Sequence, residues 1–182
     1  MTAPTWIAFL RASNLGAHRK FGKADVERVS AAAGFDDVAV YLNTGNVRVV
    51  GGADRAEVRA RLEAAYLADR GFEVPTMVVS PAELRRVHAD GEDLGRDHAG
   101  TRFVSFLADA PTPEAVTAFE QRWGPDPDRP HHAVVRDRAV HLLLGEDYLS
   151  GRLTNADVEK LLGPATNRTA NVVATLVQRW CG

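Results

Sequence analysis

The feature that most constrains the fold is a β-hairpin pattern within residues 37–50, "DVAVYLNTGNVRVV". Two runs rich in valine flank Thr44 and Gly45, and a glycine in a turn supplies the positive φ that tight turns require. A two-residue turn there predicts that Leu42 lies opposite Val47, with successive residues alternating between the two faces. The hairpin therefore predicts a sheet with one apolar face and one more polar face.

The elements around this hairpin predict the order β-α-β-β-α-β. The apolar run "WIAFL" at residues 6–10 is typical of a central strand, and "KADVERVSAAAGF" repeats its apolar residues at helical spacing up to Gly34. A second helix begins at Asp54, and a strand follows within residues 72–80, where Pro75 favours an edge position. This is the order of elements in ferredoxin-like domains.

A similar order recurs in the second part of the chain. Residues 102–108 predict a strand, and residues 132–144 predict a hairpin that turns at Asp137-Arg138. A helix is expected after each of these segments, and a final helix is expected over residues 171–180. The recurrence predicts two related halves, although no repeat of individual residues is visible.

The stretch "DGEDLGRDHAG" at residues 90–100 separates these parts, because it has no helical or strand period and many turn-forming residues. We therefore predict an N-terminal half at residues 1–90, a linker at 91–100, and a C-terminal half with a terminal helix at 101–182. The predicted fold class is α+β, with two ferredoxin-like halves whose antiparallel or mixed sheets carry packed helices.

Composition excludes several classes of protein. The chain has 182 residues and a formal net charge of -2, so it offers no bulk attraction to nucleic acid or to an acidic membrane. Its single cysteine, Cys181, allows neither an internal disulfide nor a cysteine-based zinc cluster. The sequence contains no membrane-spanning run and no secretory signal pattern. We therefore expect a cytoplasmic protein with no membrane association.

Polar residues follow the first strand and the hairpin turn. In the predicted order the first two strands run parallel, so the loop after the first and the turn after the second lie at the same end of the sheet. Arginine donors, asparagine amides and open backbone N–H groups suit phosphate or carboxylate oxygens. Local turn stabilisation is the alternative role for such residues. The first candidate ligand-binding residues are Arg11, Asn14, Gly16, Thr44, Gly45 and Asn46.

A third polar segment precedes the final helix. Thr166 or Asn167 is expected to cap that helix, whose first-turn N–H groups and dipole attract anions, and Arg168 stands beside it. Ordinary capping is the simpler interpretation of the segment taken alone. If the helix starts near the end of the first sheet, Arg168 and Asn171 join the same site.

These segments resemble the bacterial family called domain of unknown function 1697. After the first strand, Arg11, Asn14 and Gly16 match the family pattern R-G-x-N-x-G-G, whereas Ala12 and Ala17 replace glycines. The resemblance covers essentially the whole chain and is strongest in its first fifty residues. It implies an α+β fold of two related halves with no established activity.

Two further family motifs are present in altered form. The S-G-N turn of the family stands here as Thr44-Gly45-Asn46. The late T-x-R-N-W-N-T motif matches only at Thr166, Arg168 and Asn171. A site shared by the family is therefore expected to be altered or lost in part in this chain.

No signature assigns a reaction. The sequence lacks a G-x-S-x-G elbow, a P-loop and a dinucleotide fingerprint, so catalytic residues are unknown. His132 and His141 are expected diagonally on one hairpin face, but no third ligand stands at a recognisable spacing. We therefore predict neither a metal site nor a cofactor.

Three functions follow from these observations. The first is binding of a small anionic or phosphate-containing ligand in a polar cleft at one end of the sheet. The second is a structural or protein-interaction module in which the polar loops pin the two halves together. The third, weak binding of single-stranded nucleic acid, would use a sheet face carrying Tyr41 and Arg48, although a second aromatic is missing. The sequence does not predict the oligomeric state.

Overall fold

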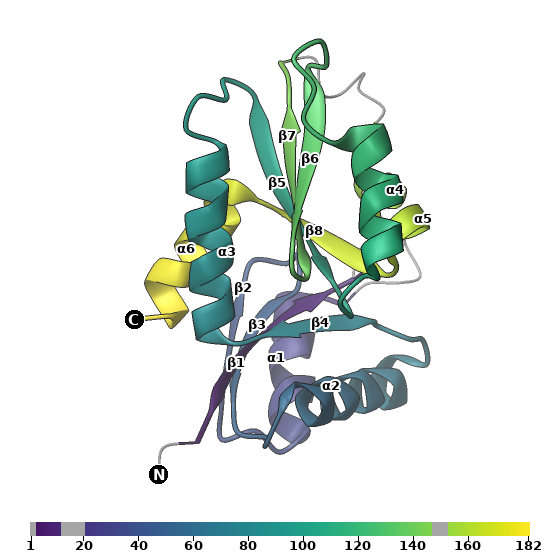
Figure 1. The fold of residues 1–182 in the computed structure, drawn as a ribbon. Coiled ribbons are helices and arrows are strands. Elements are labelled where there is room, and N and C mark those ends of the chain that lie inside the picture. The colour runs from purple at the N-terminus through teal and green to yellow at the C-terminus, as the bar shows by residue number, and fades with distance from the viewer. Residues whose placement is uncertain (1–2, 12–20, 147–152) are drawn as a thin grey trace. The chain divides into compact units, whose positions relative to one another are not determined.

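The computed structural model describes residues 3–11, 21–146 and 153–182, and it divides the chain into two compact units, Met1–Glu83 and Leu84–Gly182 (Figure 1). Within the described residues there are two four-stranded sheets in which all neighbouring strands are antiparallel. The predicted α+β fold of two halves is therefore confirmed.

The first unit follows the β-α-β-β-α-β order, and its sheet has the strand order β2-β3-β1-β4. Its elements are β1 (Thr5–Leu10), α1 (Lys23–Ala32), β2 (Asp37–Tyr41), β3 (Asn46–Val50), α2 (Arg55–Arg70) and β4 (Thr76–Val79). Alternate residues of β3, Val47 and Val49, are fully buried in an apolar core with Val58 and Leu62 of α2. Burial of this face explains why the valine-rich hairpin folds as a covered sheet.

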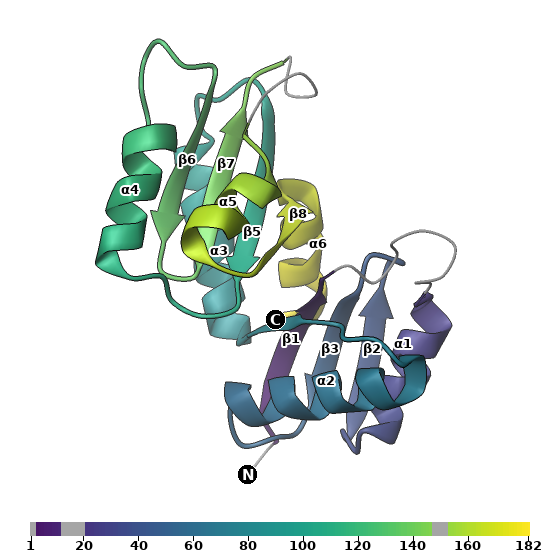
Figure 2. The same cartoon turned by 90° about the vertical axis from the view of Figure 1, so that its right-hand side faces the viewer.

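The second unit repeats this order in a sheet with the strand order β6-β7-β5-β8. Its elements are β5 (Thr101–Leu107), α4 (Pro113–Trp123), β6 (His131–Arg136), β7 (Ala139–Leu144), α5 (Asn155–Leu162) and β8 (Ala165–Thr169). Helices α4 and α5 lie side by side (Figure 2), and Phe119 and Val158 join a core with Val140 and Leu142.

One helix follows the last strand of each repeat: α3 (Pro81–Leu94) and α6 (Ala170–Trp180). Residues 91–94 thus belong to α3, whereas the sequence analysis placed them in a linker at 91–100. The turn-forming residues there did not break the helix, because Leu84 and Val87 bury its apolar side. None of the described helices is long and apolar enough to cross a membrane.

The repeat extends to individual hydrogen bonds. The Glu63 carboxylate accepts from the backbone N–H of Thr76 at the start of β4 (2.8 Å), and Glu159 accepts from Ala165 at the start of β8 (3.1 Å). The hydroxyl oxygens of Ser80 and Thr169 likewise accept from the N–H three residues on, at the starts of α3 and α6. The two units are therefore built on the same plan, down to the side chains that hold the last strand and the helix after it.

The first hairpin differs from the prediction in register. A four-residue bend, Leu42 to Gly45, replaces the two-residue turn, so Val40 rather than Leu42 lies opposite Val47. Leu42 is left outside the strand with a φ of 60° and an exposed side chain. Because the shift is two residues, the face assigned to each strand residue was correct. The second hairpin does turn at Asp137-Arg138, as predicted.

Strand β8 was not predicted, because its sequence, "ATNRT", is polar. It pairs with β5, and its burial alternates as in a strand, with Thr166 and Arg168 buried and Asn167 and Thr169 exposed. Thr169, rather than Thr166 or Asn167, caps α6. The expected capping residues are therefore wrong, because the sheet extends to residue 169 and uses their backbone.

Candidate functional site

The end of β1 lies beside the bend of the first hairpin. The Leu10 N–H donates to the Gly45 carbonyl (2.8 Å), and the Arg11 N–H donates to the Pro75 carbonyl (2.8 Å). This arrangement follows from topology, because β1 and β2 are both antiparallel to β3 and therefore parallel to each other. Arg11 is thus brought to the bend as predicted. Asn14 and Gly16 lie outside the described residues.

Asn46 holds the bend in place. Its side chain is 0% exposed, and its amide donates to the Tyr41 carbonyl (2.9 Å) and to the Thr44 hydroxyl (3.0 Å). Gly45 has a φ of 72°, a conformation that favours glycine. Thr44 is exposed at the surface of the bend. Asn46 is therefore a positioning residue: its two hydrogen bonds fix the conformation of the bend that contains Thr44 and Gly45.

The start of helix α1 belongs to the same end of the sheet, which the sequence analysis missed. Gly22, the residue before the helix, has no side chain to cap it, and the Lys23 N–H donates instead to the side-chain oxygen of Asn43 in the bend (3.3 Å). The first turn of a helix carries a partial positive charge. The acidic residue of that turn, Asp25, is paired with Arg28 (3.3 Å) and Arg70 (2.9 Å).

Two cationic residues stand at this end of the sheet. Arg11 is half-buried and Lys23 is exposed, and both stand where the backbone positions just described converge. A planar guanidinium, a helix start and a backbone turn are the groups that proteins use to hold phosphate or carboxylate oxygens. The chemistry that this arrangement favours is binding of an anion.

The corresponding end of the second sheet has the same pair of backbone hydrogen bonds but different side chains. The Leu107 N–H donates to the Arg138 carbonyl (2.9 Å), and the Ala108 N–H donates to the Pro164 carbonyl (2.9 Å). Ala108 therefore takes the place of Arg11, and Arg138 takes the place of Gly45. The Arg138 side chain is 9% exposed and donates to the carbonyls of Leu107 (3.1 Å) and Ala108 (3.0 Å). The second end is thus filled by an arginine of its own.

Comparison with known proteins defines the family. The family described as "Protein of unknown function (DUF1697)" matches residues 3–137 of this chain. The chain belongs to this family. The DUF1697 match includes Arg11 and the bend at 42–45, so the candidate end of the first sheet lies within the matched residues.

A solved structure extends the likeness to the whole DUF1697 chain. It is described as that of conserved bacterial protein SP0830 from Streptococcus pneumoniae, and it covers 97% of this chain and 98% of its own, with a TM-score of 0.72. The sequence identity is 13%, so the likeness shows the fold alone. No curated protein matches the chain.

Two predicted site residues lie in the second unit of this DUF1697 protein, beyond the matched residues. Arg168 is 7% exposed and donates to the Thr166 hydroxyl (2.9 Å) and the Asn167 carbonyl (2.6 Å). Burial lowers the pKa of Arg168 to about 10, so it remains charged at neutral pH. Asn171 is exposed in the first turn of α6, where its carbonyl accepts from the Thr175 hydroxyl (2.9 Å). These two hydrogen bonds of Arg168 lie within β8.

The histidines of the second hairpin lie as predicted. His132 is opposite Leu143 and His141 is opposite Val134, which places both imidazoles diagonally on one face of the sheet. Within residues 3–11, 21–146 and 153–182, no group of three or more His, Cys, Asp or Glu side chains is arranged to hold a metal ion.

Proposed function

We propose that this DUF1697 protein binds a small anion of the phosphate or carboxylate class at the end of its first sheet. Arg11 supplies the charge and the directed donors, the exposed Thr44 of the bend supplies a hydroxyl, and the start of α1 adds its dipole. Asn46 positions the bend. Asn14 and Gly16 fall outside the described residues, and the proposal depends on none of their geometry.

The observation that carries the proposal is the hydrogen bond between Leu10 N–H and the Gly45 carbonyl. It ties together two segments that are 35 residues apart and that both end in polar side chains. Partial exposure of Arg11 supports a site open to a ligand, because an arginine used only as an internal clamp is buried on carbonyls, as Arg138 is.

A structural role is the second candidate, and Asn46 favours it. Its buried amide is bonded within the bend, as expected of a residue that stabilises a turn. Binding of single-stranded nucleic acid has less support, because Arg48 forms an ion pair with Asp37 of the neighbouring strand (2.5 Å). The two leading candidates differ in one respect: only the first makes the stability of the protein depend on an anion.

Thermal unfolding in phosphate, sulfate and a nucleoside monophosphate tests the proposal, with sodium chloride at equal ionic strength as the reference. Each effective ligand is expected to raise Tm, because an anion held at 100 times its Kd stabilises by about 2.7 kcal/mol. Arg11→Ala is expected to abolish this rise and Arg11→Lys to retain part of it, since lysine keeps the charge and loses the planar fork.

Arg96→Ala is the matched control, because it removes the same charge from an exposed side chain of the second unit. It is expected to leave the anion effect unchanged. No rise in Tm with any of the anions, or an equal rise in Arg11→Ala, would refute anion binding at this end. A loss of stability in Arg11→Ala that is the same with and without anions would establish the structural role instead.

A further inference from the structure

The second sheet buries a polar group that its fold leaves unsatisfied. The imidazole of His141 on β7 is 3% exposed, and its Nε2 has no hydrogen-bond partner within the described residues. The ring packs directly against helix α3, where a Cβ on Gly91 would lie 3.4 Å from its Nδ1. A glycine at this helix position lets α3 approach the ring closely. A buried imidazole in this position is favoured in its neutral form.

Two other histidines extend this contact beyond the end of α3. His132 shares the sheet face of His141, and its ring meets the ring of His98 edge-on, with 6.2 Å between centroids. His98 follows α3 in the chain, and its Nε2 donates to the Leu144 carbonyl at the end of β7 (3.0 Å). We call His98, His132 and His141 the histidine face. These three rings connect the second half of α3, and the segment up to Gly100, with strands β6 and β7.

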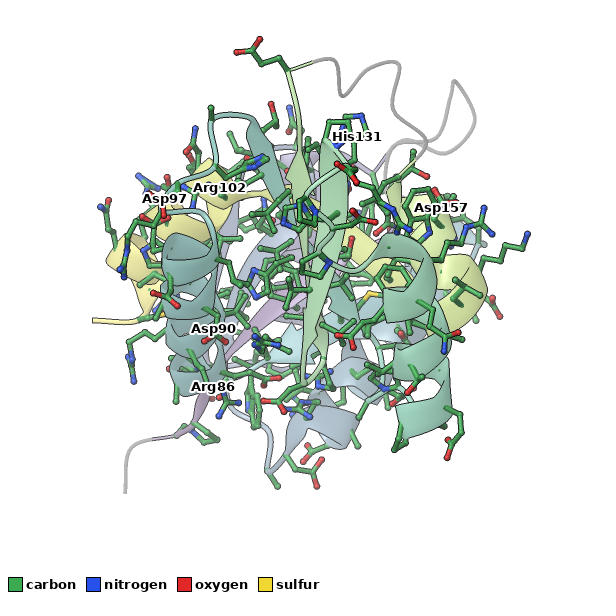
Figure 3. The ribbon with its side chains drawn as sticks, turned by 45° about the horizontal axis from the view of Figure 1, so that its top comes forward. Arg86, Asp90, Asp97, Arg102, His131 and Asp157 are labelled. Carbon is green, nitrogen blue, oxygen red and sulfur yellow. The ribbon has the colours of Figure 1, made fainter. Side chains whose placement is uncertain are left out.

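A second tie between this part of α3 and the sheet runs through an arginine of β5. Arg102 on β5 donates to the Gly91 carbonyl (2.8 Å) and pairs with Glu92 (3.1 Å). Figure 3 shows Arg102 beside the end of α3, with Asp90 further back along the helix. Arginine stays charged throughout the physiological range. The hydrogen bond from Arg102 to the Gly91 carbonyl therefore does not depend on the protonation of a side chain in this range, in contrast to the contacts of His132 and His141.

The charges around the histidine face oppose protonation on balance. Asp90 of α3 favours a charged His141, whereas Arg136 of β6 disfavours it, and burial disfavours it more than either, so that the pKa of His141 falls to about 4. Burial and the neighbouring His98 also lower the pKa of His132. Arg102 and Arg168 share this sheet face on β5 and β8 and add further positive charge.

We propose that the histidine face is an acid-sensitive contact: charging His132 and His141 releases the second half of α3 and the segment up to Gly100 from strands β6 and β7. The released state hydrates His141, separates the facing rings of His98 and His132, and exposes the sheet surface beneath Gly91. The trigger is proton concentration alone, and the device is independent of the anion site in the first unit.

Hydrogen exchange of the full chain, with rates corrected for the intrinsic effect of pH, tests this inference. Between pH 7 and pH 5 the protection of amides in residues 91–94 is expected to fall at least about tenfold, because opening is coupled to proton uptake. Amides of α2 in the first unit provide the internal reference, and their protection is expected to change less than twofold.

Two substitutions separate the mechanism from general acid instability. His141→Gln and His132→Gln each remove one titrating ring, and each is expected to reduce the pH dependence of α3 protection. Since His132 is half-buried, its variant keeps the test decisive if His141→Gln fails to fold. His88→Gln, which removes a half-buried histidine from the same helix, is expected to leave the pH dependence unchanged. Parallel loss of protection in α2 and α3, or full pH dependence in His132→Gln, would overturn the proposal.

Discussion

The corresponding ends of the two sheets have the same pattern of backbone hydrogen bonds, and they differ in the side chains that stand there. At the end of the first strand of each unit, one N–H donates to the carbonyl of a hairpin turn and the next N–H donates to the carbonyl of a proline. The donors are Leu10 and Arg11 in the first unit and Leu107 and Ala108 in the second. In the second unit Arg138 occupies its own end, whereas the first unit has Gly45 at that position.

This difference teaches where to look for function in a duplicated fold. An arginine that donates to the carbonyls of its own sheet stabilises the fold, and those donors are not available to a ligand. At the other end, a glycine stands in the bend and the arginine is partly exposed to solvent. The contrast assigns stability to the second end and ligand binding, by our proposal, to the first.

The largest predicted effect is a loss of stability in acid that arises from the second unit. Because the folded pKa of His141, about 4, lies below the ordinary value of 6.5, the unfolded chain binds more protons in this range. The free energy of unfolding is therefore expected to fall as pH drops from 6.5 to 4 and to level off below 4, by up to about 3 kcal/mol in total. Urea unfolding from pH 7.5 to 4, compared between wild type and His141→Gln, measures this contribution.

A difference between those two curves that does not grow toward low pH would contradict the assignment to His141. Carboxylates also take up protons near pH 4, but their effect on the free energy of unfolding is the same in both proteins. The difference between the two curves therefore isolates the imidazole of His141. Probes in each unit would then show whether the second unit alone loses stability.

The second predicted effect breaks the filled end. Arg138→Ala removes a buried guanidinium and leaves the carbonyls of Leu107 and Ala108 without that donor, so unfolding should become easier by about 2 kcal/mol. Denaturant unfolding with an unchanged m-value is the measurement. Arg138→Lys is the control, and it is expected to recover part of the loss because the ammonium still donates. An effect under about 0.5 kcal/mol would show that the arginine does not hold this end.

The third predicted effect concerns the bend. Asn46→Ala removes two hydrogen bonds from a buried position, which should lower stability by about 1–2 kcal/mol. Its counterpart by register is Ala139, which lies opposite Phe106 as Asn46 lies opposite Phe9, and there the turn has only two residues and needs no such amide. If Asn46→Ala leaves stability unchanged but abolishes the anion effect, Asn46 contacts the ligand itself rather than positioning the bend.

Sequence patterns predicted the elements better than their ends. The valine alternation predicted the faces of the first hairpin, because side-chain period fixes the face whatever the turn length. It did not predict the bend, since the choice between two and four residues depends on where Asn46 finds its partners, Tyr41 and Thr44.

Two features of the structure depend on tertiary contacts and could not be predicted from local sequence. Strand β8 consists of polar residues, and its pairing with β5 alone makes it a strand. The contact of Asn43 with the start of α1 joins residues 20 positions apart and has no local signature. By contrast, the meeting of Arg11 with the bend followed from strand direction alone, which the order of elements already specified.

The smallest predicted effect is also the sharpest test of the comparison between the two ends. Without any anion, Arg11→Ala should change the free energy of unfolding by less than about 0.5 kcal/mol, because water replaces the contacts of a half-buried arginine. Arg138→Ala in the same buffer is the matched substitution, and it should cost several times more. Equal costs would mean that both arginines clamp their sheets, and the first end would then be a second structural clamp instead of a binding site. A small cost for Arg11→Ala that grows when phosphate is added, with no such growth for Arg138→Ala, would show that the first end uses its arginine on a ligand and the second uses its arginine on its own backbone.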